Sequence, residues 1–284
     1  MQQHVLEINH LNILSPYDEA NGQIFLLKDI GLKVRQGQWL SVLGANGSGK
    51  STLARAIAGF RMQEADGEVI RPAGDRPIPI VLQQPDAAIL GATPWEDVLL
   101  MLEQHGGEEE HMQKRAEEAL ASAGLHDHMH QPIATLSGGQ KQLTAIAGCL
   151  AVEPPLLVLD EVTSMLHPDT AAEVHERVRR LNRQGTTVIW ITQNVEELRG
   201  EDRVVILDKG EIVYDGDTDG VFCPAAEQNG ESICERLGFE APYCVQVARE
   251  LNALGLPLGK MPLTPEELAA YAAAWIGEEG EDGN

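Results

Sequence analysis

The sequence predicts an α/β fold with a mostly parallel core sheet, an N-terminal antiparallel β subdomain, a helical insertion and a small C-terminal helical extension. Two observations lead to this class. Short apolar runs at 39–44, 156–161 and 186–192 alternate with segments of helical periodicity, which is typical of a parallel sheet covered by helices. Before them, residues 4–14 and 24–34 alternate apolar and polar side chains, as half-buried antiparallel strands do.

The remaining elements follow from local signals along the chain. The run WLSVLG (39–44) leads into a glycine-rich loop, after which STLARAIAGF continues as a helix. Thr93, Pro94 and Glu96 supply an N-cap, a first-turn proline and an N3 acid, so they predict the start of a helical region that extends to about Ala123. We further expect short strands at 69–72 and 78–84, a helix near 170–184, and a hairpin in RVVILDKGEIVYDG that turns at Lys209-Gly210.

The domain boundary is predicted from a change in composition near residue 228. Residues 1–228 are expected to form one domain, in which the helical subdomain occupies about 92–150. Residues 229–284 are expected to form a C-terminal helical extension, since they contain two amphipathic segments. The last seven residues, EEGEDGN, are predicted to be a disordered acidic tail.

Composition excludes several classes of protein. Lys and Arg total 21 against 44 Asp and Glu, a net charge of −23, which argues against a nucleic-acid ligand and suits a basic protein partner. The four cysteines have no CxxC spacing and are expected to be reduced thiols. No signal peptide is recognised, and no run approaches the roughly 18 apolar residues of a membrane span. A role at a membrane would therefore require another chain as anchor.

The segment GANGSGKS (44–51) fits the phosphate-binding pattern G-x-x-x-x-G-K-[ST] in the required strand–loop–helix context. Backbone N–H groups of such a loop cradle phosphates, Lys50 reaches the β and γ phosphates, and the Ser51 hydroxyl binds Mg²⁺. A nucleotide and Mg²⁺ are therefore expected here. The predicted nucleotide-binding residues are Gly44, Asn46, Gly47, Ser48, Gly49, Lys50, Ser51 and Thr52.

The segment LLVLDE (156–161) is an apolar strand that ends in two acids. Asp160 at the strand end is predicted to hold Mg²⁺, together with Ser51, and Glu161 is then placed to polarise the attacking water. An apolar run ending in acids is weak by itself. Its position after a phosphate-binding loop makes it a strong indication of nucleotide hydrolysis.

The segment LSGGQKQ (136–142) provides a second helix N-terminus suited to anions, and one nucleotide does not need two such cradles from a single subunit. Here the chain resembles the ATP-binding-cassette (ABC) family, from about residue 4 to 222. The resemblance implies a P-loop NTPase fold of ABC type in which this signature closes over the ATP of a partner ATPase subunit. The residues that carry it are Ser137, Gly138, Gly139 and Gln140.

Two further residues take their roles from the same resemblance. Gln83, in VLQQP, resembles the family glutamine that senses the metal and the membrane partner, so it is expected among the catalytic and Mg²⁺-binding residues. Tyr17, in SPYDEANG, resembles the aromatic residue that stacks on adenine, although that segment is irregular and Phe25 is an alternative.

A narrower resemblance is to the ATPase subunits of energy-coupling-factor transporters. LQQPDAAIL (82–90) resembles their Q-loop, and the segment from APYCVQVARELNALG onward resembles their C-terminal helical extension. This resemblance implies an ATPase that drives uptake of a vitamin or a transition-metal ion. It also implies an integral membrane scaffold, a substrate-capturing subunit, and a peripheral location on the cytoplasmic face of the membrane.

Two positions depart from the family pattern. After the strand TTVIWIT the family places a histidine that contacts the γ-phosphate, whereas this chain has Gln193, which can donate a hydrogen bond but cannot become cationic. Where the family reads S-A-L-D, this chain reads Ser-Met-Leu-His, with His167 in place of the Asp. One explanation of both departures is tolerated drift, in which the site still turns over because Glu161 remains. The other is a heterodimer with a paralogous ATPase, in which the two composite sites differ. The alternative function is then a nucleotide-binding regulatory subunit with weak hydrolysis of its own.

The segment LHDHMH contains His126, His128 and His130, which raise the alternative of a metal site. Alternate spacing does not place three side chains on one helical face, and Pro132 follows closely. We therefore expect a polar loop at this position.

Overall fold

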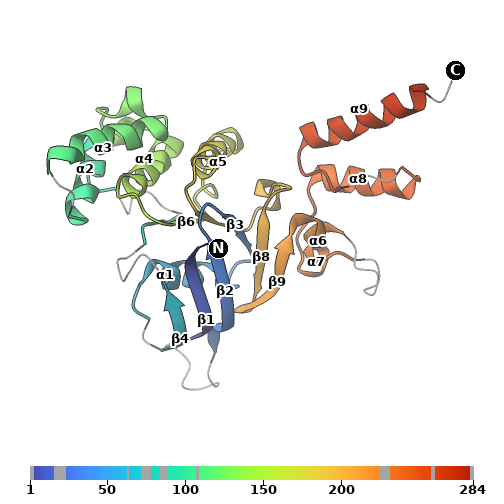
Figure 1. Cartoon of the computed structure of the whole chain (residues 1–284), viewed down its shortest axis with the longest axis horizontal. Coiled ribbons are helices and arrows are strands. Elements are labelled where there is room, and N and C mark those ends of the chain that lie inside the picture. The colour runs from blue at the N-terminus through green and yellow to red at the C-terminus, as the bar shows by residue number, and fades with distance from the viewer. Residues whose placement is uncertain are drawn as a thin grey trace.

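The computed structural model (Figure 1) describes residues 3–15, 24–62, 64–71, 78–83, 89–106, 109–223, 231–256 and 260–281. Its strands form a three-stranded sheet, with the order β2-β1-β4, and a six-stranded sheet, with the order β5-β6-β7-β3-β8-β9. These strands are β1 (His4–Leu14), β2 (Phe25–Arg35), β3 (Trp39–Leu43), β4 (Ala65–Ile70), β5 (Ile80–Val81), β6 (Leu157–Asp160), β7 (Val188–Thr192), β8 (Arg203–Asp208) and β9 (Glu211–Asp217).

The larger sheet is parallel from β5 to β8, and β9 adds an antiparallel edge. The hairpin β8-β9 turns at Lys209 and Gly210, both with positive φ, as the sequence predicts. The smaller sheet is antiparallel throughout its described part, and its β1-β2 pair confirms the two strands expected near the N-terminus. The predicted mixture of a mostly parallel core and an antiparallel β subdomain is therefore confirmed.

Helices cover the core sheet, and Figure 1 shows α2, α3 and α4 grouped on one side of the molecule and α8 and α9 on the other. Thr93 caps α2 by accepting a hydrogen bond of 3.2 Å from the N–H of Glu96, as the capping pattern predicts. The helices are α1 (Lys50–Ala58), α2 (Pro94–Gln104), α3 (Glu109–Ser122), α4 (Gly138–Ala151), α5 (Pro168–Arg183), α6 (Thr218–Phe222), α7 (Ile233–Arg236), α8 (Tyr243–Ala253) and α9 (Pro265–Glu281).

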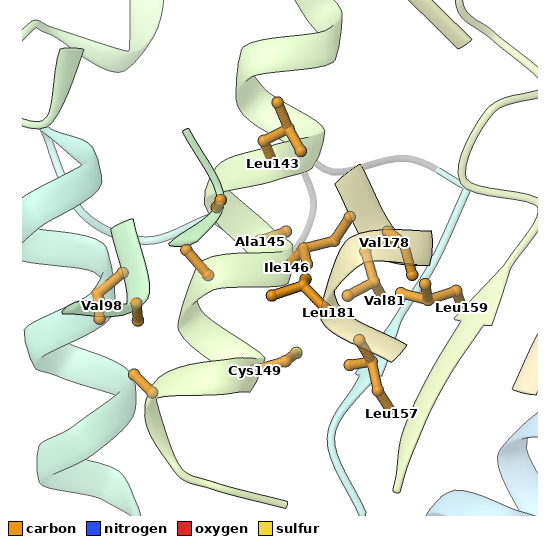
Figure 2. Close-up of a cluster of buried hydrophobic side chains, with 14 of the residues drawn as sticks. Val81, Val98, Leu143, Ala145, Ile146, Cys149, Leu157, Leu159, Val178 and Leu181 are labelled. Carbon is orange, nitrogen blue, oxygen red and sulfur yellow. The ribbon is translucent and has the colours of Figure 1, made fainter. Parts of the chain in front are cut away.

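The strand β7 is buried on both faces, and its side chains divide between two cores with a period of two. Val188 and Trp190 belong to an apolar cluster on the face covered by α4 and α5, whereas Ile189 and Ile191 belong to a cluster on the face covered by α1. Figure 2 shows part of the first cluster. There side chains of α4 and α5 pack over Leu157 and Leu159 of β6. Burial on both faces fixes the register of this strand, since a slip of one residue would exchange its two faces.

A buried polar network ties α5 to the sheet. Arg179 pairs with Asp202 through both of its terminal nitrogens, and its guanidinium lies 3.6 Å from the centre of the Trp39 ring. Asp202 also accepts a 2.9 Å hydrogen bond from the Ser41 hydroxyl of β3. Next to this pair, the His175 ring packs edge-on against Trp39 and Trp190. Each buried charge is thus paired or hydrogen-bonded, as burial requires.

The C-terminal segment packs on the sheet rather than standing apart. Cys234, Val245 and Leu263 share an apolar cluster with Val204 and Phe222. The division at residue 228 stays a prediction. The helix α9 continues to Glu281, so the first four residues of the expected disordered tail are helical, because the Ala- and Glu-rich stretch before them favours helix. None of the helices in the described part of the chain combines the length and apolarity of a bilayer crossing.

The pH dependence of stability should reveal the buried histidine. Burial, reinforced by the charge of Arg179, lowers the pKa of His175 to about 2, well below the value of about 6.5 for free imidazole. Between these values the unfolded chain binds a proton that the folded chain does not, so the stability due to neutral His175 is complete above about pH 6.5 and is lost as pH falls.

We therefore predict that His175→Phe, which keeps a ring between the two tryptophans, flattens the decline of unfolding free energy below about pH 6.5. The difference in slope should approach about 1.4 kcal/mol per pH unit. Urea unfolding at several pH values measures it. Equal slopes for variant and wild type would show that His175 titrates normally in the folded chain.

Candidate functional site

The residues predicted to bind and hydrolyse nucleotide follow neighbouring strands at one edge of the parallel sheet. In the β6-β7 pair Asp160 lies opposite Ile191, and in the β7-β3 pair Thr192 lies opposite Leu43. The next residues along these three strands, Glu161, Gln193 and Gly44, therefore emerge side by side at the carboxyl edge. Ligands of open α/β sheets bind outside this edge.

The loop between β3 and α1 packs closely against its surroundings at its glycines. A Cβ on Gly44 would lie 2.6 Å from the Leu207 carbonyl oxygen, and one on Gly49 would lie 2.7 Å from that of Leu26. Gly47 and Gly49 also have positive φ, which glycine adopts without strain. Gly49 is the N-cap of α1, so the N–H groups of the first helical turn, including those of Ser51 and Thr52, face the loop.

The side chains of the loop differ in exposure. Asn46 and Gly47 are exposed and Thr52 is half-buried. Ser48 is buried, and its hydroxyl has no hydrogen-bond partner within the described part of the chain. Lys50 is 4 % exposed, and its ammonium donates to the carbonyl oxygens of Gly44 at 2.8 Å and Ala45 at 3.0 Å. These bonds hold the charged head of Lys50 inside the curve of the loop.

Lys50 also joins the loop to the end of β6, because its Nζ lies 3.2 Å from Oε1 of Glu161. Glu161 is mostly buried and has a φ of +51°, a left-handed conformation that is uncommon for residues other than glycine. Its N–H donates to the Ile191 carbonyl oxygen at 2.9 Å, and its own carbonyl accepts from the Ser164 hydroxyl at 2.8 Å. Strained conformations of this kind persist where the surrounding contacts demand them.

Asp160 provides the donor set that a hard cation prefers. Its carboxylate is buried, and its Oδ1 has no hydrogen-bond partner among the described residues. Burial raises the pKa of Asp160, while a hydrogen bond with Ser51 opposes that effect. Carboxylate and hydroxyl oxygens are suitable first ligands for Mg²⁺, so an unpartnered Oδ1 beside Ser51 fits that ion.

Gln83 and Gln193 reach the same edge from opposite sides of β6. Gln83 is half-buried and lies two residues after β5, whose Ile80 and Val81 pair with Val158 and Leu159 of β6. Gln193 is exposed, directly after β7. The rest of the predicted Q-loop, residues 84–88, lies outside the described residues. His167 is exposed and 3.7 Å from Asp169, at the start of α5.

A cavity of about 490 Å³ lies beside Glu161 and Gln193, and two of the polar residues that line it belong to none of the sequence motifs. These are Thr163, two residues beyond Glu161, and Glu197, four residues beyond Gln193. Spacing from the motif residues is the only sequence signal that points to them. His175 also lines the cavity, and its buried Nε2 has no partner in the described part of the chain.

The signature segment forms a complete capping box at the start of α4. The Ser137 hydroxyl accepts from the N–H of Gln140 at 3.2 Å, and the Gln140 side-chain oxygen accepts from the N–H of Ser137 at 2.9 Å. Ser137 and Gly138 are exposed, whereas Gly139 is buried where a Cβ would lie 2.2 Å from the Thr170 methyl of α5. The helix N-terminus is therefore open to a ligand at its first residues.

Two of the sequence segments singled out above are separate in sequence from the strands of the sheet edge. Tyr17 lies outside the described residues, so its stacking role stays a prediction. The alternative, Phe25, is 38 % exposed and lines a hollow of about 460 Å³ with Asn12 and Leu14.

No group of three or more His, Cys, Asp or Glu side chains arranged to hold a metal occurs among the described residues, and His126 and His130 are exposed.

Comparison with known proteins gives a family and a set of similar chains. The family model "ABC transporter" matches residues 27–164. The chain is 35% identical over 278 residues to the energy-coupling factor transporter ATP-binding protein EcfA1 of Geobacillus kaustophilus, covering 94% of this chain and 96% of the relative. It is 40% identical over 266 residues to the protein of the same name from Symbiobacterium thermophilum, covering 88% and 90%.

Solved structures give the same result. The structure of cbiO1 from Clostridium perfringens, described as part of the ABC transporter complex cbiONQ, superposes with a TM-score of 0.67 at 26% identity, covering 89% of this chain and 96% of that one. The ATP-binding cassette MJ0796, in a dimeric post-hydrolysis state bound to ADP and Pi, superposes with a TM-score of 0.63 at 28% identity, covering 75% and 98%.

Proposed function

The chain belongs to the ABC transporter family, among the energy-coupling factor ATP-binding proteins, and it is an ATPase coupled to transport. We propose on this basis that it powers uptake of a vitamin or a transition-metal ion. The similarity to energy-coupling factor ATP-binding proteins supports the uptake role, and the observation that carries ATP hydrolysis is the cluster at the sheet edge. There Lys50 in the phosphate loop contacts Glu161, and Asp160 and Ser51 lie together beside them.

We assign ATP binding to the loop Gly44–Thr52 and to Lys50 within it. The N–H groups of the loop and of the first turn of α1 bind the phosphates, since a helix N-terminus favours anions. Phosphate oxygens compete with Glu161 for the Lys50 ammonium, which lies 3.2 Å from that carboxylate. ATP binding therefore frees Glu161 to accept a proton from the attacking water.

Ser51 and Asp160, with Gln83 at the end of the neighbouring strand, are the residues that would hold Mg²⁺. When bound there, the ion would supply positive charge that stabilises the negative charge of the phosphates. Gln193 donates a hydrogen bond from its amide to the γ-phosphate. Because a neutral amide stabilises developing negative charge less than a charged imidazole does, Gln193 slows hydrolysis more than it weakens ATP binding.

We further propose that the chain works as half of an ATPase dimer, with Ser137, Gly138, Gly139 and Gln140 facing the partner's ATP. Its relative MJ0796 is dimeric with ADP and Pi, and its relative cbiO1 is part of a transporter complex. The partners are a second ATPase, a paralogue rather than a second copy, an integral membrane scaffold and a substrate-capturing subunit. The location is peripheral, on the cytoplasmic face of the membrane, with no role for nucleic acid.

A second candidate function is a regulatory subunit that binds ATP and leaves most hydrolysis to its partner. Gln193 and the exposed His167 favour it, since both replace residues of the family pattern. Glu161 opposes it, because the carboxylate expected to activate water is present and is held at the end of β6.

Glu161→Gln decides between these functions. The amide keeps the shape of the side chain but cannot take a proton from water, so the ATP turnover of the assembled transporter should fall by about 100-fold or more, while ATP affinity changes by only a few fold. Turnover is measured in the complex with the co-expressed second ATPase and scaffold. Turnover that persists in this variant, but stops when the partner's corresponding acid is changed, would establish the regulatory function.

Gln193→His tests the effect of having glutamine, rather than the histidine of the family pattern, directly after β7. If the amide limits hydrolysis at this site, an imidazole that can carry charge should raise kcat several-fold, because a charge-assisted hydrogen bond stabilises the transition state more than a neutral one does. The KM for ATP should change little. The same assembled transporter provides the measurement. An unchanged or lower kcat would mean that Gln193 does not limit the chemical step.

A further inference from the structure

We propose that Glu197 is a positioning residue for ATP hydrolysis, which holds the loop carrying Glu161 against the strand that leads to Gln193. The proposal rests on the function proposed above, because it takes Glu161 as the group that activates water. Glu197 does not itself touch the reacting atoms in this account. It acts through Thr163 on one side and Trp190 on the other.

Glu197 is a buried carboxylate whose two oxygens accept hydrogen bonds from two different segments of the chain. Oε1 accepts a hydrogen bond of 2.6 Å from the Thr163 hydroxyl, and Oε2 accepts one of 2.9 Å from the Trp190 indole N–H. The side chain is 9 % exposed. Both donors are neutral, so a charge is buried here to join two segments by hydrogen bonds. An apolar residue would fill this space without the free-energy cost of desolvating a carboxylate. The presence of Glu197 therefore indicates that its two hydrogen bonds are needed to orient the segments that they join.

Thr163 fixes the loop after β6 to the rest of the protein at a second place, two residues beyond the bond from the Glu161 N–H to the Ile191 carbonyl oxygen. Glu161 begins this loop with its left-handed φ, and the loop is closed by hydrogen bonds from Ser164 to Glu161 and from the N–H of Leu166 to the Thr163 carbonyl. These bonds lie within the loop. The Thr163–Glu197 bond links it to a different element, and thereby limits how Glu161 is directed.

Glu197 is itself held in a rigid frame. It ends the short 3₁₀ helix Val195–Glu197, which Asn194 caps by accepting from the N–H of Glu196 at 3.1 Å. Asn194 is in turn fixed to the end of β7, since its N–H donates to the Thr192 hydroxyl at 2.9 Å. The carboxylate therefore moves with β7 and with the loop that carries Gln193.

The cavity beside the site brings these groups together. Glu161, Thr163, Gln193 and Glu197 all line the same space of about 490 Å³. A displacement of the Thr163 loop therefore changes the placement of Glu161 relative to Gln193. Small misplacements of a catalytic group lower the rate of the chemical step more than they change substrate binding.

Thr163→Val tests this inference, because it removes the hydroxyl with little change in shape. We expect kcat for ATP in the assembled transporter to fall about tenfold while KM for ATP stays within about twofold. Thr163→Ser, which keeps the hydroxyl, should restore most of the turnover. Glu197→Gln can still accept from Trp190 and donate to Thr163, so it should also retain most of the turnover if the role is positioning.

Trp190→Phe is the matched control. It removes a hydrogen bond to the same carboxylate, but on the side of β7 rather than on the loop of Glu161. Both variants lose one buried hydrogen bond, and Trp190→Phe also leaves a cavity where the larger ring packed, so Trp190→Phe should lower the melting temperature at least as much as Thr163→Val does. Only Thr163→Val should lower kcat strongly, and a purely structural role for Glu197 would predict equal effects on turnover.

The outcomes separate this inference from the proposed function. If Glu161→Gln abolishes turnover and Thr163→Val lowers kcat no more than Trp190→Phe does, the positioning role is wrong and the proposed function stands. A large loss of kcat in Glu197→Gln would also overturn the positioning role. This second measurement tests that role even if Thr163→Val does not fold. If Glu161→Gln leaves turnover unchanged, the proposed function fails and the positioning role fails with it.

Discussion

The register of the parallel strands β6, β7 and β3 is the constraint on which the rest of this structure depends. Because β7 is buried on both faces, a slip of one residue would exchange Trp190 with Ile189 or Ile191 between two differently shaped cores. The same register that satisfies the cores fixes the level at which each strand ends. Gly44, Glu161 and Gln193 therefore reach one edge together, and apolar packing far from solvent determines where the polar groups of the site lie.

The polar groups at that edge are costly to bury and are compensated in different ways. Lys50 is satisfied by two carbonyl oxygens and Glu161, and Glu197 by two neutral donors. Asp160 is only partly compensated, since one of its oxygens has no partner among the described residues, and the nearby Ser48 hydroxyl has none there either. A buried carboxylate oxygen without a partner, as in Asp160, indicates a site for a ligand. Both oxygens of Glu197 are hydrogen-bonded, which indicates a structural role instead. The same kind of side chain thus serves binding in one place and orientation in another.

Much of this arrangement could be predicted from the sequence, because its signals are local. The phosphate loop is defined by glycine spacing, the strand β6 by an apolar run that ends in Asp160 and Glu161, and α2 by its Thr93 cap. The contacts between distant segments could not be predicted. Nothing in the chain around Thr163 indicates that its hydroxyl meets Glu197, 34 residues away, or that Arg179 pairs with Asp202. The helical end of α9 was also missed, because an acidic composition alone does not distinguish a solvated helix from a disordered tail.

The placement of the metal at Asp160 is tested most directly by measuring how ATP binding depends on Mg²⁺. ATP affinity is measured by calorimetry for the wild-type chain and Asp160→Asn, each with Mg²⁺ and with a chelator. We expect Mg²⁺ to strengthen ATP binding by about tenfold or more in the wild type, about 1.4 kcal/mol for each factor of ten. Most of that gain should be absent from Asp160→Asn, while the chelated affinities stay within a few fold. An equal gain in both proteins would contradict the assignment of the metal to this strand end.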